Sequence, residues 1–328
     1  MTNLRALPGM TFSWLVRLLE VPFDLIERLI GGRRMPWAFL APNMVIFGIF
    51  SFLPIALLIG YAFTGGSDVL LGDRPFVGLE NFARLFDCEN YLSPYTCRES
   101  FFWIAVRNTL WYVTIKVTAM LAISLMTAII LNRIWFGRGF FRAVFFYPVL
   151  LSPVVVGLVW QWFLNTNGLL NAFLVELGFE RVIFMLDIFW SRFFVIFVSI
   201  WFQMGFYTLI LLAGLQAIPS DIYEAAAIDG TPRWRVFTRI TLPMLAPNLV
   251  VVLVLLMIRA VQVFDEAYVL TNGGGPGTAN TFLVQFIYET AFASDLKLYG
   301  LASAASVVMG FVLLILTLVQ LQLARKAE

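Results

Sequence analysis

The sequence contains few side chains that could carry out catalysis or hold a metal. Its 328 residues include no histidine, which excludes histidine general bases, histidine metal sites and haem ligation. Two cysteines, Cys88 and Cys97, are too few for a zinc or iron–sulfur cage. None of the lysines, Lys116, Lys297 and Lys326, follows a glycine as a P-loop requires. We therefore expect no catalytic site, metal or cofactor in this chain.

Polar residues at two places in apolar helical stretches could contact a solute. Phe202, Gln203 and Phe206 share one helical face. A second stripe with helical spacing consists of Leu256, Arg259, Ala260 and Val263. A charge such as Arg259 costs about 2.5–3.5 kcal/mol at the centre of a membrane helix, so something must compensate it. A carboxylate or helix end of a partner chain would do so, and so would a charged solute.

The segment at about 219–230 combines a charged start, small residues and a sharp stop. Asp221 and Glu224 have the spacing of a capping box, and Gly230 can end a helix in the left-handed conformation. The alanines at 225–227 would let another protein approach this short helix closely. The pattern predicts a docking helix, with a plain re-entry helix before the next apolar stretch as the alternative.

These candidates lie in a chain whose composition is typical of a membrane protein. Hydrophobic residues make up 61%, against about 45–50% in soluble proteins, and the mean hydropathy is +0.87. A bilayer-spanning helix takes about 20 apolar residues. Six stretches qualify, at about 39–63, 105–131, 140–163, 193–216, 244–264 and 300–323. We predict an all-α integral membrane protein with six transmembrane helices, in which Pro148 and Pro153 kink the third. Arg107 and Lys116 are expected to snorkel toward helix ends.

Basic residues predict the orientation of these spans. Thirteen of the 22 Lys and Arg residues lie in 1–38, 132–142, 217–243 and the tail at 324–328, and six lie in the other loops. By the positive-inside rule, both termini and the 217–243 segment are cytoplasmic. Cys88 and Cys97 then lie outside, where they could form a disulfide; two free thiols are the alternative.

The amino-terminal segment, residues 1–38, differs from the six spans. Charged residues at three- and four-residue spacing line one face of 12–30, and leucines and other apolar residues fill the opposite face. This pattern predicts an amphipathic helix lying flat at the cytoplasmic interface. We expect a transmembrane permease domain at 39–323 to follow it.

The docking segment resembles the EAA signature of permeases of binding-protein-dependent ABC importers. The matching positions are Glu224, Ala225, Ala226, Gly230, Ile240, Leu242 and Pro243. Residues 270–292 and 147–171 further resemble the carbohydrate permeases of the maltose-transporter type. The resemblance covers roughly residues 39–323 and implies the type I importer permease fold, in the bacterial cytoplasmic (inner) membrane.

The resemblance also implies roles and partners. Glu224, Ala225, Ala226 and Gly230 would belong to the coupling helix, which sits in a groove of an ATPase subunit. The helical face with Phe202, Gln203 and Phe206 and the stripe from Leu256 to Val263 match positions that line the sugar pathway. Packing against a partner permease is the alternative. The implied partners are a second homologous permease in a heterodimer, two ATPase subunits that use ATP and Mg, an extracytoplasmic solute-binding protein and a carbohydrate. Membrane lipid surrounds the spans, and no nucleic acid is expected.

Three alternatives differ in substrate or class. Arg259 would suit an anionic sugar, a glycerol phosphate or a polyol phosphate carried by the same class of importer. A secondary transporter would need coupling carboxylates in its spans, and the six stretches contain no Asp or Glu. A membrane enzyme would need acids, bases or metal ligands at the interface, and the commonest of these, histidine, is missing.

Overall fold

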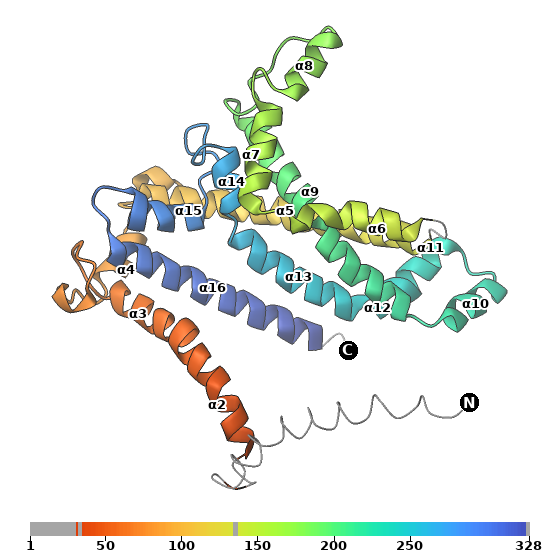
Figure 1. The fold of residues 1–328 in the computed structure, drawn as a ribbon, viewed down its shortest axis with the longest axis horizontal. Helices are drawn as coiled ribbons and strands as arrows, with labels where there is room; N and C mark the ends of the chain where they lie inside the picture. The colour runs from red at the N-terminus through yellow and green to blue at the C-terminus, as the bar shows by residue number, and fades with distance from the viewer. Residues whose placement is uncertain (1–30, 32–34, 134–136, 326–328) are drawn as a thin grey trace, which may run out of the picture. The chain divides into compact units, whose positions relative to one another are not determined.

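The computed structural model describes residue 31 and residues 35–133 and 137–325, and it is helical almost throughout (Figure 1). Two isolated β-bridges, Thr64–Phe76 and Cys88–Cys97, occur among these residues, and no strand does. The prediction of an all-α fold is therefore confirmed. The amphipathic helix predicted at 12–30 lies outside the described residues.

The chain divides into two compact units, residues 1–60 and 61–328. In the first unit, α2 (Met35–Phe47) continues through a π-helical turn (Gly48–Phe52) into α3 (Leu53–Ala62), whose last two residues belong to the second unit. The 28 residues from Met35 to Ala62 are long and apolar enough to cross a membrane. They carry exposed large side chains such as Trp37 and Phe50, as a surface in contact with lipid would.

In the second unit, three further single helices are long enough to span a bilayer. They are α5 (Ser100–Arg133), α9 (Ile188–Ala217) and α16 (Tyr299–Arg325). Two pairs of helices, each bent at a short break, could provide two more spans. One runs through α6 (Arg138–Phe146), a 3-10 turn (Tyr147–Leu150), α7 (Pro153–Leu164) and α8 (Leu169–Glu176). The other runs through α11 (Arg233–Val236), a π-helical turn (Phe237–Thr241), α12 (Leu242–Met244) and α13 (Ala246–Val261). The described residues thus hold four to six spans.

The third and fifth predicted crossings are the two that bend. The third turns by 98° just before Pro153, and the fifth turns by 67° near Leu245. Proline at the first position of a helix begins it readily but cannot continue a preceding one, since it lacks the N–H donor. The expected kink at Pro153 is therefore a change of direction between two helices.

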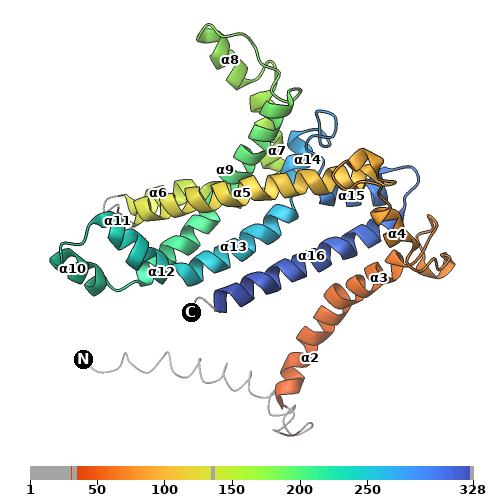
Figure 2. The same cartoon turned by 180° about the vertical axis from the view of Figure 1, so that it is seen from behind.

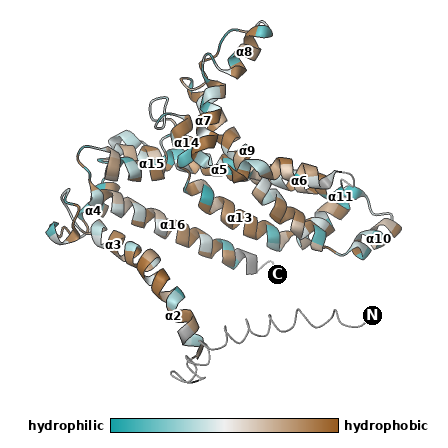
Figure 3. Cartoon of the chain, in the orientation of Figure 1, coloured by the Kyte–Doolittle hydropathy of each residue, from teal (hydrophilic) through white to brown (hydrophobic). Residues whose placement is uncertain are grey.

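Short elements connect the spans. They are α4 (Glu80–Phe86), α10 (Ser220–Ile228), α14 (Asp265–Leu270), α15 (Leu283–Tyr288) and the turns at Leu71–Asp73, Pro94–Thr96 and Glu289–Ala293. α5 packs against α9 and α13, and in both views α16 lies beside α13 (Figures 1 and 2). Large apolar residues of α16, among them Phe311, Leu314 and Leu318, are exposed, as those of a lipid-facing helix are. Figure 3 colours each helix by the hydropathy of its residues.

Gly205 permits the close approach of α9 to the α6 region, and its replacement is expected to be costly. A Cβ at this position would lie 2.2 Å from the carbonyl oxygen of Phe145, which is backbone and cannot move aside alone. Gly205→Ala should destabilise the fold by about 1–3 kcal/mol, the usual cost of overpacking. Gly310→Ala is the matched control, because nothing lies within 4 Å of the corresponding position in α16. Thermal unfolding in detergent compares the two, and an equal midpoint would contradict the packing described here.

Candidate functional site

The predicted docking segment forms the nine-residue helix α10, but its amino-terminal end differs from the prediction. Pro219 occupies the N-cap position and makes no side-chain capping bond. Because the helix begins at Ser220, Asp221 lies inside its first turn, where it accepts a hydrogen bond from the Ser220 hydroxyl at 3.3 Å. The capping box predicted from Asp221 and Glu224 is therefore wrong. The spacing of a capping box is present, but the helix begins two residues too early for Asp221 to be its N-cap.

The carboxyl-terminal end of α10 is a Schellman motif, as the glycine suggests. Gly230 has φ +65° and its N–H donates to the carbonyl of Ala227 at 3.1 Å. The next N–H, of Thr231, donates to the carbonyl of Ala226 at 3.0 Å. These two bonds satisfy carbonyls that a helix end leaves free, and glycine adopts the required left-handed conformation without strain.

The faces of α10 differ in exposure. Glu224 and Ala225 are exposed, and Ile228, which is 87% exposed, extends the same surface. Ala226, by contrast, is buried. On the inner side the Tyr223 hydroxyl and the Thr241 hydroxyl are 3.2 Å apart, so a hydrogen bond ties α10 to the π-helical turn that follows α11. The helix is thus held from behind and leaves an outward face bearing Glu224, Ala225 and Ile228, which we call the outer face of α10.

A second site is a cavity of about 350 Å³ between α9, α13 and α14. Five of the seven residues expected on the solute pathway line it, namely Phe202, Gln203, Phe206, Arg259 and Val263. The remaining wall includes the carboxyl-bearing residues Asp265 and Glu266. The arrangement offers aromatic surface beside charged and amide groups, as sites for polar organic ligands do.

Leu256 and Ala260, also expected on the pathway, do not line this cavity. Both are fully buried in the hydrophobic core of the second unit. The reason is helical geometry, because a stripe at i, i+3, i+4 and i+7 is wide, and α13 packs against both α5 and α9. Only the Arg259 side of the stripe opens into the cavity.

A buried polar network lies behind the cavity wall. Glu266 Oε1 accepts hydrogen bonds from Ser199 Oγ at 3.0 Å and from Gln203 Nε2 at 3.3 Å. Gln203 Oε1 in turn accepts from Lys116 Nζ at 3.3 Å, and the Tyr112 hydroxyl donates to Ser199 Oγ at 2.8 Å. The Gln203 amide therefore joins a buried cation to a buried carboxylate, which is how charges withdrawn from water are tolerated.

Sequence reasoning missed this network for two reasons. Lys116 was expected to snorkel, but it stands in the middle of α5 and is 0% exposed, so that expectation is wrong. Glu266 lies two residues beyond the predicted fifth span, yet α14 folds it back into the bundle, where it is 6% exposed. The absence of carboxylates within the six stretches thus did not mean a bundle without a buried carboxylate.

At the opposite end of the bundle from α10, a disulfide and side-chain hydrogen bonds hold the loops in place. Cys88 and Cys97 form a disulfide. The side-chain amide of Asn108 donates to the carbonyls of Thr278 and Thr281 at 2.7 and 3.1 Å, which attaches the loop after α14 to α5. Asn280 donates to Ser191 Oγ at 2.7 Å and attaches the same loop to α9.

Comparisons with known proteins agree with this architecture. The family model described as "binding-protein-dependent transport system inner membrane component" matches residues 120–328. The trehalose/maltose transport system permease protein MalF from Thermococcus litoralis is 37% identical over 254 residues, which cover 77% of this chain and 81% of that protein.

Two solved structures extend the likeness to the fold. A bacterial ABC transporter involved in the import of the acidic polysaccharide alginate matches with a TM-score of 0.76 at 27% identity, covering 94% of this chain and 99% of that chain. The alginate transporter in complex with an alginate pentasaccharide-bound periplasmic protein matches with a TM-score of 0.75 at 26% identity, covering 92% and 97%. This chain therefore belongs to the family of binding-protein-dependent transport system inner membrane components, the permeases of ABC importers.

Proposed function

We propose that this chain is one of two permease subunits of a carbohydrate importer that works by alternating access. Two ATPase subunits would hydrolyse ATP with Mg, and a solute-binding protein would deliver the sugar. The outer face of α10 carries the proposal, since it displays the EAA residues Glu224 and Ala225 on a helix that is fixed from behind. A relative crystallised with a ligand-bound periplasmic protein supports the delivery step.

The chain itself would bind no nucleotide, and its role would be mechanical. Closure of the ATPase subunits would push α10, and the hydrogen bond between Tyr223 and Thr241 would pass that movement to α11 and α13. The excess of Lys and Arg residues in the termini and the 217–243 segment supports a cytoplasmic α10 and cytoplasmic termini in the bacterial inner membrane. The disulfide at Cys88 and Cys97 would then face the oxidising side.

The cavity between α9, α13 and α14 favours a neutral carbohydrate. Phe202 and Phe206 offer rings for the apolar faces of a sugar. Arg259 is one cation, but Asp265 and Glu266 stand in the same wall, so the cavity has no excess of positive charge. An anionic sugar is the second candidate, because Arg259 lines the cavity and a transporter with a similar structure is involved in the import of the acidic polysaccharide alginate.

Arg259→Gln distinguishes the two substrate classes. A charge-assisted hydrogen bond contributes about 1.5–3 kcal/mol, so losing one to an acidic sugar should lower its uptake at least about tenfold. For a neutral sugar we expect less than about a threefold change in the reconstituted importer. Uptake of neutral and uronic oligosaccharides is measured side by side, and a selective tenfold loss with the uronic sugar would reject the neutral assignment.

Co-purification tests the proposed assembly. We expect the tagged chain to bring down an ATPase subunit when both are produced together, and deletion of 224–230 to abolish this association. Retention of the ATPase subunit after the deletion would contradict the role of α10. Equal insertion of both forms into the membrane is the control that separates lost docking from lost folding.

A further inference from the structure

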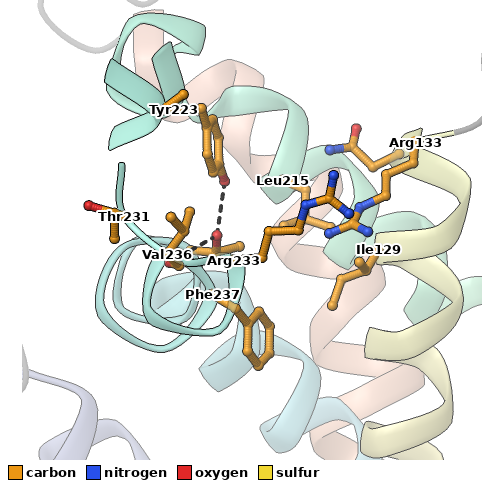
Figure 4. A pocket seen from close by; sticks show the side chains of 11 residues that line it. Ile129, Arg133, Leu215, Tyr223, Thr231, Arg233, Val236 and Phe237 are labelled. Atoms are coloured by element: carbon orange, nitrogen blue, oxygen red, sulfur yellow. Dashed lines mark hydrogen bonds between the residues drawn. The ribbon is translucent and has the colours of Figure 1, made fainter. Parts of the chain in front are cut away.

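A separate cavity of about 540 Å³ lies between α10 and the ends of α5 and α9 (Figure 4). Its lining comes from four places in the chain that meet here. The residues are Ile129, Asn132, Arg133, Leu215, Tyr223, Ala227, Thr231, Arg233, Val236, Phe237 and Thr241. Arg133 is the last residue of α5 and Arg233 the first of α11, so two spans and the docking segment each contribute.

The cavity concentrates positive charge without a balancing carboxylate. The side chains of Arg133 and Arg233 both point into it (Figure 4). No Asp or Glu is among its lining residues. Within residues 35–133 and 137–325, neither guanidinium group forms an ion pair with a carboxylate. Both arginines are exposed to solvent, and an anion lying between their two like charges would be attracted by both.

The surroundings of the two arginines match a phospholipid better than a simple ion. Ile129, Leu215 and Phe237 give the same cavity apolar walls beside its cationic groups. Guanidinium groups bind phosphate oxygens in a bidentate manner. The ends of membrane-spanning helices lie at the depth of lipid headgroups, and basic pockets there bind anionic headgroups.

A carboxylate of an ATPase subunit is the competing occupant, and the faces of α10 argue against it. The residues of α10 that line the cavity are Tyr223 and Ala227, whereas Glu224, Ala225 and Ile228 form the outer face. A protein docked on the outer face would therefore lie across the helix from the cavity. From these contacts we propose that the cavity binds the phosphate of an anionic phospholipid, held between Arg133 and Arg233.

Bound lipid would brace α10 against α5 and α9. The position of α10 would then depend on the charge of the membrane lipids as well as on the ATPase subunits. The lipid site concerns the inner side of α10, so it stands apart from the outer face on which the proposed ATPase docking depends.

Selective lipid retention tests the site in the complete purified transporter. The complex is incubated in detergent with equal amounts of phosphatidylglycerol and phosphatidylcholine, and the retained lipids are quantified by mass spectrometry. The Arg133→Gln/Arg233→Gln variant should lower the preference for phosphatidylglycerol about 30-fold, which is about 2 kcal/mol at about 1 kcal/mol per arginine. Arg235→Gln/Arg239→Gln is the matched control, because it removes two charges from the same segment but none from the cavity lining.

Each result of this experiment has a definite meaning. Loss of preference in the cavity variant alone supports the site, whereas an equal loss in both variants, or in neither, overturns it. Displacement of phosphatidylglycerol by excess inorganic phosphate would assign the pocket to the free anion and overturn the lipid occupant. If the parent complex does not prefer phosphatidylglycerol to phosphatidylcholine, an ATPase carboxylate becomes the better candidate occupant, and the lipid proposal is overturned. If the glutamine variant does not fold, Arg133→Lys/Arg233→Lys replaces it, and a partial loss of preference is then expected.

Discussion

Replacing Lys116 with methionine is expected to destabilise the protein by about 3–5 kcal/mol, because it leaves Glu266 as a buried charge without its cation. Lys116 is 0% exposed, and its ammonium group reaches the carboxylate through the Gln203 amide. Chemical unfolding in detergent micelles measures the change. The expected loss is large because removing one member of a buried charge pair costs more than removing both.

Two further variants separate this effect from a general loss of packing. Lys116→Met combined with Glu266→Gln removes both charges, and we expect it to recover most of the lost stability. Lys297→Met is the matched single control, since Lys297 is exposed and its loss should stay within about 0.5 kcal/mol. A double variant as unstable as Lys116→Met would show that the two charges are not energetically coupled.

Ala225→Trp is expected to uncouple the ATPase subunits from the permease. Ala225 lies on the outer face of α10, where a small side chain lets a partner approach closely. A bulky ring at the centre of such an interface should weaken docking by at least about 2 kcal/mol, or roughly 30-fold in affinity. Co-purification of the ATPase subunit and ATP-driven uptake should fall together.

The matched control makes the same change at the other end of the bundle. Ala293 is exposed in the π-helical turn Glu289–Ala293, and Ala293→Trp should leave ATPase association unchanged. If both variants, or neither, bound the ATPase subunit normally, the docking role of α10 would be contradicted. Helicity of each purified variant shows that it is folded before the comparison is made.

Sequence patterns predicted the long helices well because membrane helices have a simple signature. Length and hydropathy located the single helices α5, α9 and α16, since a bilayer demands about 20 apolar residues of any helix that crosses it. Gly230 also ended α10 as predicted, because its left-handed conformation depends on local backbone sterics.

Features that depend on tertiary contacts could not be predicted in the same way. Glu266 follows a predicted span, and only the packing of α14 against α7 and α9 buries it. Leu256 and Arg259 share a stripe in the sequence, yet α5 and α9 cover the first and leave the second facing the cavity. The arginine cavity behind α10 was missed because Arg133 and Arg233 are 100 positions apart and meet only in the fold.

Reconstituted transport tests the central proposal most directly. This chain, its partner permease and the ATPase subunits are placed in liposomes with ATP inside, and a labelled oligosaccharide and its binding protein are added outside. We predict uptake that requires both ATP and the binding protein and that is lost with Ala225→Trp. Uptake that proceeds without ATP, driven by an ion gradient alone, would contradict the account and indicate a secondary transporter.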